Sequence, residues 1–156
     1  MDYSGEKWGD FMLMGEFHHN IDEKGRLIIP SKLREELGEN IIVTRGLEDC
    51  LFLYSFKEWS LIVSKLKALP FTKKDARSFT RMFLSGATNA EFDKQGRIKI
   101  PTPLLDYASL DKETVIIGVN DRLEIWSKEK WNNFVSESKE ELSSLADHLF
   151  DTTFEV

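Results

Sequence analysis

The sequence predicts a mixed α/β (α+β) fold made of two tandem copies of one small unit. Residues 22–30 recur 71 positions later as residues 93–101, and five of the nine positions are identical: Asp, Gly, Arg, Ile and Pro. The match continues downstream, where residues 41–43 correspond to residues 115–117. Copies this similar indicate one supersecondary unit used twice. A unit of about 43 residues is too small to bury a full core alone, so we expect the two units to interleave their hairpins around a pseudo-twofold axis.

Each unit is expected to begin with two strands around a tight turn. Apolar and polar residues alternate over residues 16–21, which is typical of a half-buried strand. Asp22 and Gly25 then favour a hairpin turn, because Asp accepts turn hydrogen bonds and Gly supplies a positive φ. Residues 26–29 form the returning strand, which Pro30 ends because proline cannot donate into a ladder and suits the first turn of a helix. The further elements expected are helices at 31–37 and 102–108 and strands at 40–45, 51–54, 114–119 and 122–126.

Helices are expected to complete the two units and to connect them. Apolar residues at helical spacing follow Trp59 and Trp131, and a third periodic segment covers residues 73–84. No Gly/Ser linker separates the halves, so we expect them to be packed together. We place the two repeated domains at residues 16–58 and 87–130.

The composition is that of a soluble globular protein, with 41% apolar and 31% charged residues. No apolar run approaches the roughly 18 residues of a membrane span, and no signal-peptide pattern opens the chain. The single Cys50 lies in an apolar run, which favours a small core residue and a reducing cytoplasm over a disulfide framework or a nucleophile. Residues 1–11 show no hydrophobic period and precede a plausible natural start at Met12, so we expect a loose extension.

The net charge of −6 is concentrated at the two ends of the chain. Residues 137–156 sum to −5 and residues 1–11 to −2, so the remaining residues 12–136 sum to +1. Residues 22–34 and 93–103, which contain the two copies of the repeated motif, are each a local patch of +2. This distribution permits nucleic-acid binding without requiring it.

The repeated turn itself has two interpretations. Asp22, Gly25 and Arg26 recur as Asp93, Gly96 and Arg97, and the arginine in each copy could serve only to pair with the aspartate of its own turn. A hairpin has no folding need for arginine in particular, however, and the neighbouring positions vary between the copies. Arg forks onto phosphate or onto the O6/N7 edge of guanine better than Lys does, so the recurrence favours a nucleic-acid contact.

Other residue combinations indicate little chemistry. His18 and His19 point to opposite faces of a strand with no third ligand close in sequence, so we expect no metal site and no cofactor. No nucleophile elbow, Walker-type or dinucleotide fingerprint occurs, and an acid–base pair of Asp22 with Asp93 is a remote alternative, so we expect no enzyme. We expect the basic stripe of Lys73, Arg77 and Arg81 to be a solvated helix face, or else to contact phosphates or the acids of a neighbouring subunit. Four aromatic residues are expected to make core or inter-unit contacts (Tyr54, Trp59, Trp126, Trp131).

The combined motifs resemble the transcriptional regulator family MraZ over about residues 12–150. The segments that carry the resemblance are residues 15–17, 22–30, 73–81, 85–88 and 93–97. The resemblance implies two SpoVT-AbrB-like swapped-hairpin units per chain. It also implies a cytoplasmic, nucleoid-associated DNA-binding regulator of the division and cell-wall gene cluster, which recognises direct repeats in double-stranded DNA upstream of its own gene and assembles into a ring-like homo-oligomer.

The DNA-contacting arginines of that family fall on Arg26 and Arg97. Lys24 matches a basic position of the first turn, whereas its counterpart Gln95 does not, so the second copy is expected to bind more weakly. Lys94 is expected to contact the DNA backbone, together with Lys32, Arg34 and Lys99, because phosphate contacts set register while base contacts specify sequence. The alternative from another class is a protein-interaction or antitoxin-like module whose hairpins recognise acidic protein surfaces.

Overall fold

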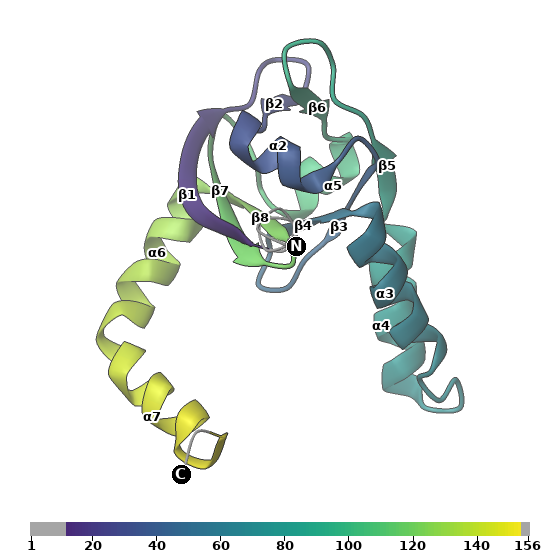
Figure 1. The fold of residues 1–156 in the computed structure, drawn as a ribbon, viewed down its shortest axis with the longest axis vertical. Coiled ribbons are helices and arrows are strands. Elements are labelled where there is room, and N and C mark those ends of the chain that lie inside the picture. The colour runs from purple at the N-terminus through teal and green to yellow at the C-terminus, as the bar shows by residue number, and fades with distance from the viewer. Residues whose placement is uncertain (1–11, 154–156) are drawn as a thin grey trace, which may run out of the picture.

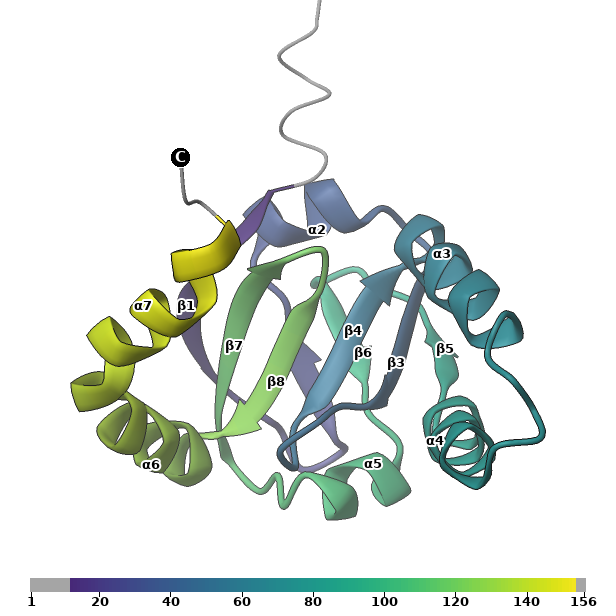
Figure 2. The same ribbon diagram turned by 90° about the horizontal axis from the view of Figure 1, so that it is seen from below.

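A computed structural model describes residues 12–153, and the expectation for residues 1–11 lies outside these described residues. Most of the strands form one antiparallel sheet, and two short strands form a second (Figures 1 and 2). The large sheet runs in the order β1 (Leu13–Asn20), β7 (Glu113–Asn120), β8 (Leu123–Ser127), β4 (Leu51–Ser55), β3 (Ile41–Arg45) and β5 (Thr88–Ala90). The small sheet pairs β2 (Arg26–Ile28) with β6 (Arg97–Lys99).

The first strands of the two units are exchanged between them. β1 pairs with β7 of the second unit, and β5 pairs with β3 of the first. The expectation that residues 26–29 return as the hairpin partner of residues 16–21 is therefore wrong, because β1 and β2 belong to different sheets. The turn between β1 and β2 still forms, but the short strand that follows each turn pairs with the equivalent strand of the other unit. The expected interleaving of the two units is confirmed.

The register of the strand pairs places the pseudo-twofold axis. In the small sheet Leu27 lies opposite Ile98, which is its own counterpart in the repeat. Two further hydrogen bonds extend this symmetry, from Ile29 N to Gly96 O (3.0 Å) and from Ile100 N to Gly25 O (2.8 Å). In the large sheet Phe52 lies opposite Glu124, the equivalent positions of β4 and β8. The axis therefore passes through the centres of both sheets.

Two hydrophobic clusters hold the layers together, one on each face of the large sheet. The first lies between that sheet and the layer formed by β2, β6, α2 (Ser31–Leu37) and α5 (Thr102–Tyr107), and it includes the fully buried Leu27, Ile98, Leu53 and Ile125. The second lies on the opposite face and joins Tyr54 and Trp126 to the half-buried Trp59 and Trp131. The expected core role of these four aromatic residues is confirmed, as is the burial of Cys50.

Helices project from the large sheet as two arms, on the side away from the repeated turns (Figure 1). One arm consists of α3 (Phe56–Lys67) and α4 (Lys74–Ser85), and the other of α6 (Lys128–Ser138), a short 3₁₀ turn η1 (Lys139–Glu141) and α7 (Leu142–Thr153). We expected one periodic helix after Trp131, whereas the structure has a break at η1. None of the helices in the described part of the chain is both long and apolar enough to span a membrane.

Candidate nucleic-acid interface

The two repeated turns adopt the same backbone conformation. Gly25 and Gly96 have φ angles of 77° and 79°, and each glycine N–H donates to the carbonyl of the turn's aspartate at 3.0 Å. A Cβ at Gly25 would lie 3.1 Å from the carbonyl oxygen of Ile100, and a Cβ at Gly96 would overlap the guanidinium of Arg34. Glycine is therefore required by both the positive φ and the space available.

The aspartate of each turn organises the arginine that follows it. Asp22 Oδ1 accepts the backbone N–H groups of Lys24 and Arg26 at 2.9 Å each, and Asp22 Oδ2 accepts from Arg26 Nε at 2.6 Å. Asp93 makes the same three contacts with the amides of Gln95 and Arg97 and with Arg97 Nε, at 2.9, 2.9 and 2.7 Å. Each arginine thus pairs with the aspartate of its own turn through its Nε atom, as the first of the two interpretations expects.

These hydrogen bonds also set the charge state of the turns. The backbone amide of Arg26 contributes most to lowering the pKa of Asp22 below its ordinary value, and the Arg26 guanidinium lowers this pKa further. The amide and guanidinium of Arg97 act in the same way on the pKa of Asp93. Both aspartates are therefore ionised at neutral pH, and each anchors one cation.

The two turns lie beside each other at one end of the molecule, at the top of Figure 1. Arg97 Nη1 approaches Asp22 Oδ2 of the other unit to 3.8 Å, so this aspartate faces both arginines. Arg97 Nη2 also donates to Gln95 Oε1 at 3.2 Å. Within residues 12–153, no hydrogen bond uses the terminal nitrogens of Arg26, whose side chain is 32% exposed against 23% for Arg97. The site therefore presents one loosely held and one firmly held guanidinium.

Arg34 has a structural role that the sequence analysis missed. Its Nη1 donates to the carbonyl of Ile29, and its guanidinium lies directly against Gly96 of the second turn. The counterpart of Arg34 in the repeat is Leu105, which packs against Gly25 of the first turn. Comparing the two copies at the 71-residue offset would have revealed this difference, since α2 supports the second turn with a cation and α5 supports the first turn with an apolar residue.

The remaining predicted cations surround the same end of the molecule. Lys24 and Lys94 are exposed at the turns, and Lys32 and Lys99 are exposed on α2 and β6. His18, by contrast, lies on β1, where its Nε2 is 2.8 Å from Glu16 Oε2. The described residues contain no group of three His, Cys, Asp or Glu side chains placed to hold a metal ion. The geometry therefore provides a cluster of cations around two exposed turns.

Comparison with protein families matches both halves of the chain. The family described as "MraZ protein, putative antitoxin-like" aligns with residues 12–82 and again with residues 83–153. The chain belongs to the MraZ family. The two turns of the structure thus lie at equivalent places in the two copies of the MraZ repeat.

Relatives of the chain carry the same family name. A protein of Desulforamulus reducens named transcriptional regulator MraZ is 55% identical over 140 residues, which cover 90% of this chain and 99% of that protein. One of Limosilactobacillus reuteri with the same name is 59% identical over 138 residues, or 88% of this chain and 97% of that protein. A solved structure of PHS018 from Pyrococcus horikoshii covers 73% of this chain and 88% of that chain at 18% identity, with a TM-score of 0.31. That similarity is too low to identify a shared fold.

Proposed function

We propose that this MraZ-family chain is a DNA-binding transcriptional regulator whose two arginine turns form the DNA contact. The observation that carries the proposal is the close approach of the turns, with Arg97 Nη1 3.8 Å from Asp22 Oδ2 of the other unit. The two turns that carry these arginines lie together at one end of the molecule, away from the helical arms (Figure 1). The relatives named as transcriptional regulators support the same class of function.

In this proposal the residues of the turns divide into three roles. Arg26 and Arg97 reach base edges or phosphates with their terminal nitrogens while Nε stays fixed by aspartate, which orients the guanidinium plane before binding. Lys24 and Lys94 contact phosphates and set the register of the protein on the duplex. The turn-forming residues Asp22, Gly25, Asp93 and Gly96 hold this geometry without touching DNA.

The finer features of the proposal come from the family resemblance. The operator consists of direct repeats upstream of the division and cell-wall gene cluster, and several copies of the chain bind it as a ring-like homo-oligomer. Two turns per chain give few contacts, so assembly increases affinity through effective concentration. The protein acts in the cytoplasm at the nucleoid, and residues 16–58 and 87–130 are its two DNA-binding repeats.

Titration of a duplex from upstream of the protein's own gene tests the proposal. Arg26→Ala and Arg97→Ala should each cost about 1–3 kcal/mol in specific binding, because a bidentate contact is lost, and should leave thermal unfolding nearly unchanged. Lys24→Ala should weaken binding to all duplexes and flatten the salt dependence, whereas Lys65→Ala, an exposed lysine on α3, is the matched control. Unchanged affinity in both arginine variants would refute the DNA contact.

The antitoxin-like description of the family favours one alternative, a protein-interaction module. The same cation cluster would then recognise an acidic protein surface instead of phosphates. Sequence dependence separates the two functions, because a DNA regulator discriminates between its operator and a scrambled duplex at equal salt. A flat plot of affinity against salt concentration on the operator would favour the protein-binding alternative.

A further inference from the structure

The two short strands that follow the turns form a ribbon whose outer face carries four side chains. β2 and β6 pair antiparallel, with Arg26 opposite Lys99 and Ile28 opposite Arg97. The middle residue of each strand is fully buried in the core, and side chains alternate between the two faces of a strand. The outer face of the β2–β6 ribbon therefore presents both arginines of the turns together with one lysine and one isoleucine.

Ile28 breaks the symmetry of this face. It occupies the place that Lys99 has in the second copy, since the two positions are 71 residues apart in the repeat. Its side chain is 40% exposed, and the other three members of the face are cations. Single exposed apolar residues are common on protein surfaces. A face that served only to hold phosphates, however, would gain nothing from isoleucine at a position where its own repeat has lysine.

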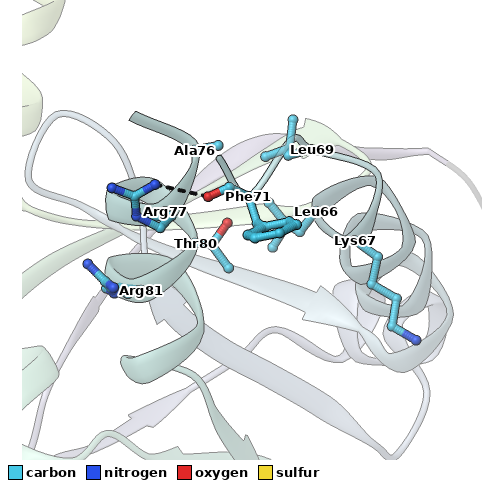
Figure 3. Close-up of a pocket in the computed structure, with 8 residues that line it drawn as sticks. All are labelled: Leu66, Lys67, Leu69, Phe71, Ala76, Arg77, Thr80 and Arg81. Atoms are coloured by element: carbon cyan, nitrogen blue, oxygen red, sulfur yellow. Dashed lines mark hydrogen bonds between the residues drawn. The ribbon is translucent and has the colours of Figure 1, made fainter. Parts of the chain in front are cut away.

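The basic stripe of α4 lies away from this face. Arg77 and Arg81 border a groove of about 340 Å³ in the α3–α4 arm, together with Leu66 and Phe71 (Figure 3). Arg77 Nη1 donates to the carbonyl of Phe71 at 3.0 Å. The arm projects on the side of the large sheet away from the turns (Figure 1). The stripe is therefore separate from the surface formed by the turns and the ribbon.

The structure holds the end of the ribbon that contains Ile28 in a fixed arrangement. Ile29, the next residue along the chain, donates its backbone N–H to the carbonyl of Gly96 at 3.0 Å. Arg97, which lies opposite Ile28, donates from Nη2 to Gln95 Oε1 at 3.2 Å. Groups that are already ordered lose less conformational entropy when they bind. This end of the ribbon is therefore suited to discriminate between bases.

The dimensions of the ribbon suit the major groove of DNA. Paired strands lie about 4.7–4.9 Å apart, and the major groove, about 12 Å wide, admits a two-stranded ribbon. A cationic side chain in the groove reaches phosphates or the acceptors of base edges. Isoleucine donates no hydrogen bond to either, and its favourable contact in the groove is the 5-methyl group of thymine.

We propose that the outer face of the ribbon enters the major groove and that Ile28 is a specificity-determining residue, which contacts the methyl group of a thymine. Directly opposed residues of two strands have Cβ atoms about 4.5–5.5 Å apart, and successive bases of one DNA strand rise by about 3.4 Å. The thymine therefore lies within two base pairs of the base that Arg97 contacts. Lys99, at the equivalent place beside Arg26, contacts a phosphate. This inference rests on the proposed function and adds to it a base preference that the arginines do not supply.

Replacing thymine by deoxyuridine tests the contact, because the two bases differ only in the 5-methyl group. The duplex from upstream of the protein's own gene is prepared with each thymine replaced singly, and affinities are measured at one salt concentration. The wild type should lose about fourfold in affinity at the contacted thymine, the value of one buried methyl group. Ile28→Ala should bind the unmodified duplex less tightly and should no longer distinguish thymine from deoxyuridine at that position.

Lys99→Ala is the matched control, because it changes the equivalent position of the second copy. It should weaken binding to the operator and to a scrambled duplex alike and flatten the salt dependence, while the preference for the thymine methyl stays. Arg97→Ala should relax the base preference at a position within two base pairs of the same thymine.

Folding of every variant is checked by circular dichroism. Should Ile28→Ala fail to fold, Ile28→Lys replaces it, because the equivalent backbone position already accommodates Lys99. This variant should also lose the preference for the methyl group, and it should steepen the salt dependence by adding a phosphate contact.

Four results would overturn the inference. They are a wild type indifferent to every thymine methyl, an Ile28 variant that keeps the fourfold preference, a Lys99→Ala variant that loses it, and an Arg97→Ala variant with unchanged base preference near that thymine. Each would leave the proposed function standing as long as the wild type discriminates between operator and scrambled duplex. A wild type that binds both duplexes equally would refute the proposed function and this inference with it.

Discussion

Replacing Leu27 with alanine should destabilise the whole chain, because this residue lies where the two units meet. Leu27 and its counterpart Ile98 are both fully buried and face each other at the centre of the small sheet. The exchanged strands β1 and β5 tie the units together a second time. Neither unit can therefore lose its core without exposing that of the other.

The expected magnitude follows from burial. Deleting the side chain of a fully buried leucine costs about 2–5 kcal/mol, which includes the cavity left behind. For a chain of this size each kcal/mol lowers the melting temperature by about 2–4 °C, so the drop should be about 4–20 °C. Ile98→Ala should lower the same transition by a similar amount. Leu47→Ala, at an exposed loop position, should change stability by less than about 0.5 kcal/mol.

Urea unfolding at one fixed protein concentration is the appropriate assay, because association shifts apparent stability. Far-ultraviolet circular dichroism reports on the sheets, and tryptophan fluorescence reports on both units through Trp59 and Trp131. The two probes should give one coincident transition in the wild type and in each variant. Two separated transitions, or a Leu27→Ala shift confined to one of them, would refute the reasoning that the exchange makes the units a single cooperative body.

Three further outcomes follow from the site and the core. Asp22→Asn should shift the Nε–H resonances of both Arg26 and Arg97 in NMR spectra, whereas Asp93→Asn should shift that of Arg97 alone, since Asp22 faces both arginines. Because the pKa values of Asp22 and Asp93 are lowered, their stabilisation of the turns should be complete above the ordinary value of 3.8 and lost as pH falls through the lowered pKa, so carboxyl titration by NMR should show midpoints below 3.8. Burial raises the pKa of Cys50 to about 12, so a thiol reagent at pH 8 should leave it unmodified in the folded protein and label it in urea.

Local patterns in the sequence were sufficient to predict most of the elements. The helix expected at residues 31–37 matches α2 (Ser31–Leu37), because Pro30 and Gly38 mark its ends. The alternation of apolar and polar residues after Arg97 matches the structure, where Ile98 is buried and Lys99 is exposed, since a strand's period of two is visible in any single copy. The repeat supplied the remaining information, because two small units without a linker must share a core.

The partners of the strands could not be read in this way. Alternation shows which face of a strand is buried but not which strand lies beside it, so adjacency in sequence suggested that residues 16–21 pair with residues 26–29. The structure instead pairs each short strand with its counterpart across the axis. The break at η1 was missed for a related reason, because the apolar spacing continues through it from Val135 to Leu142.

The paired turns also show why an identical motif need not give identical contacts. From Gln95 in place of a lysine, the sequence suggests that the second copy binds DNA more weakly. In the structure Gln95 Oε1 accepts from Arg97 Nη2 at 3.2 Å, and the guanidinium of Arg34 lies against Gly96 of that turn. An arginine already fixed by several partners loses less side-chain entropy on binding. This smaller entropy loss raises the DNA affinity of the second turn, whereas the absence of a lysine at position 95 lowers it. If the lost charge dominates, Arg26→Ala will cost more operator affinity than Arg97→Ala, and if the fixed geometry dominates, the order will reverse.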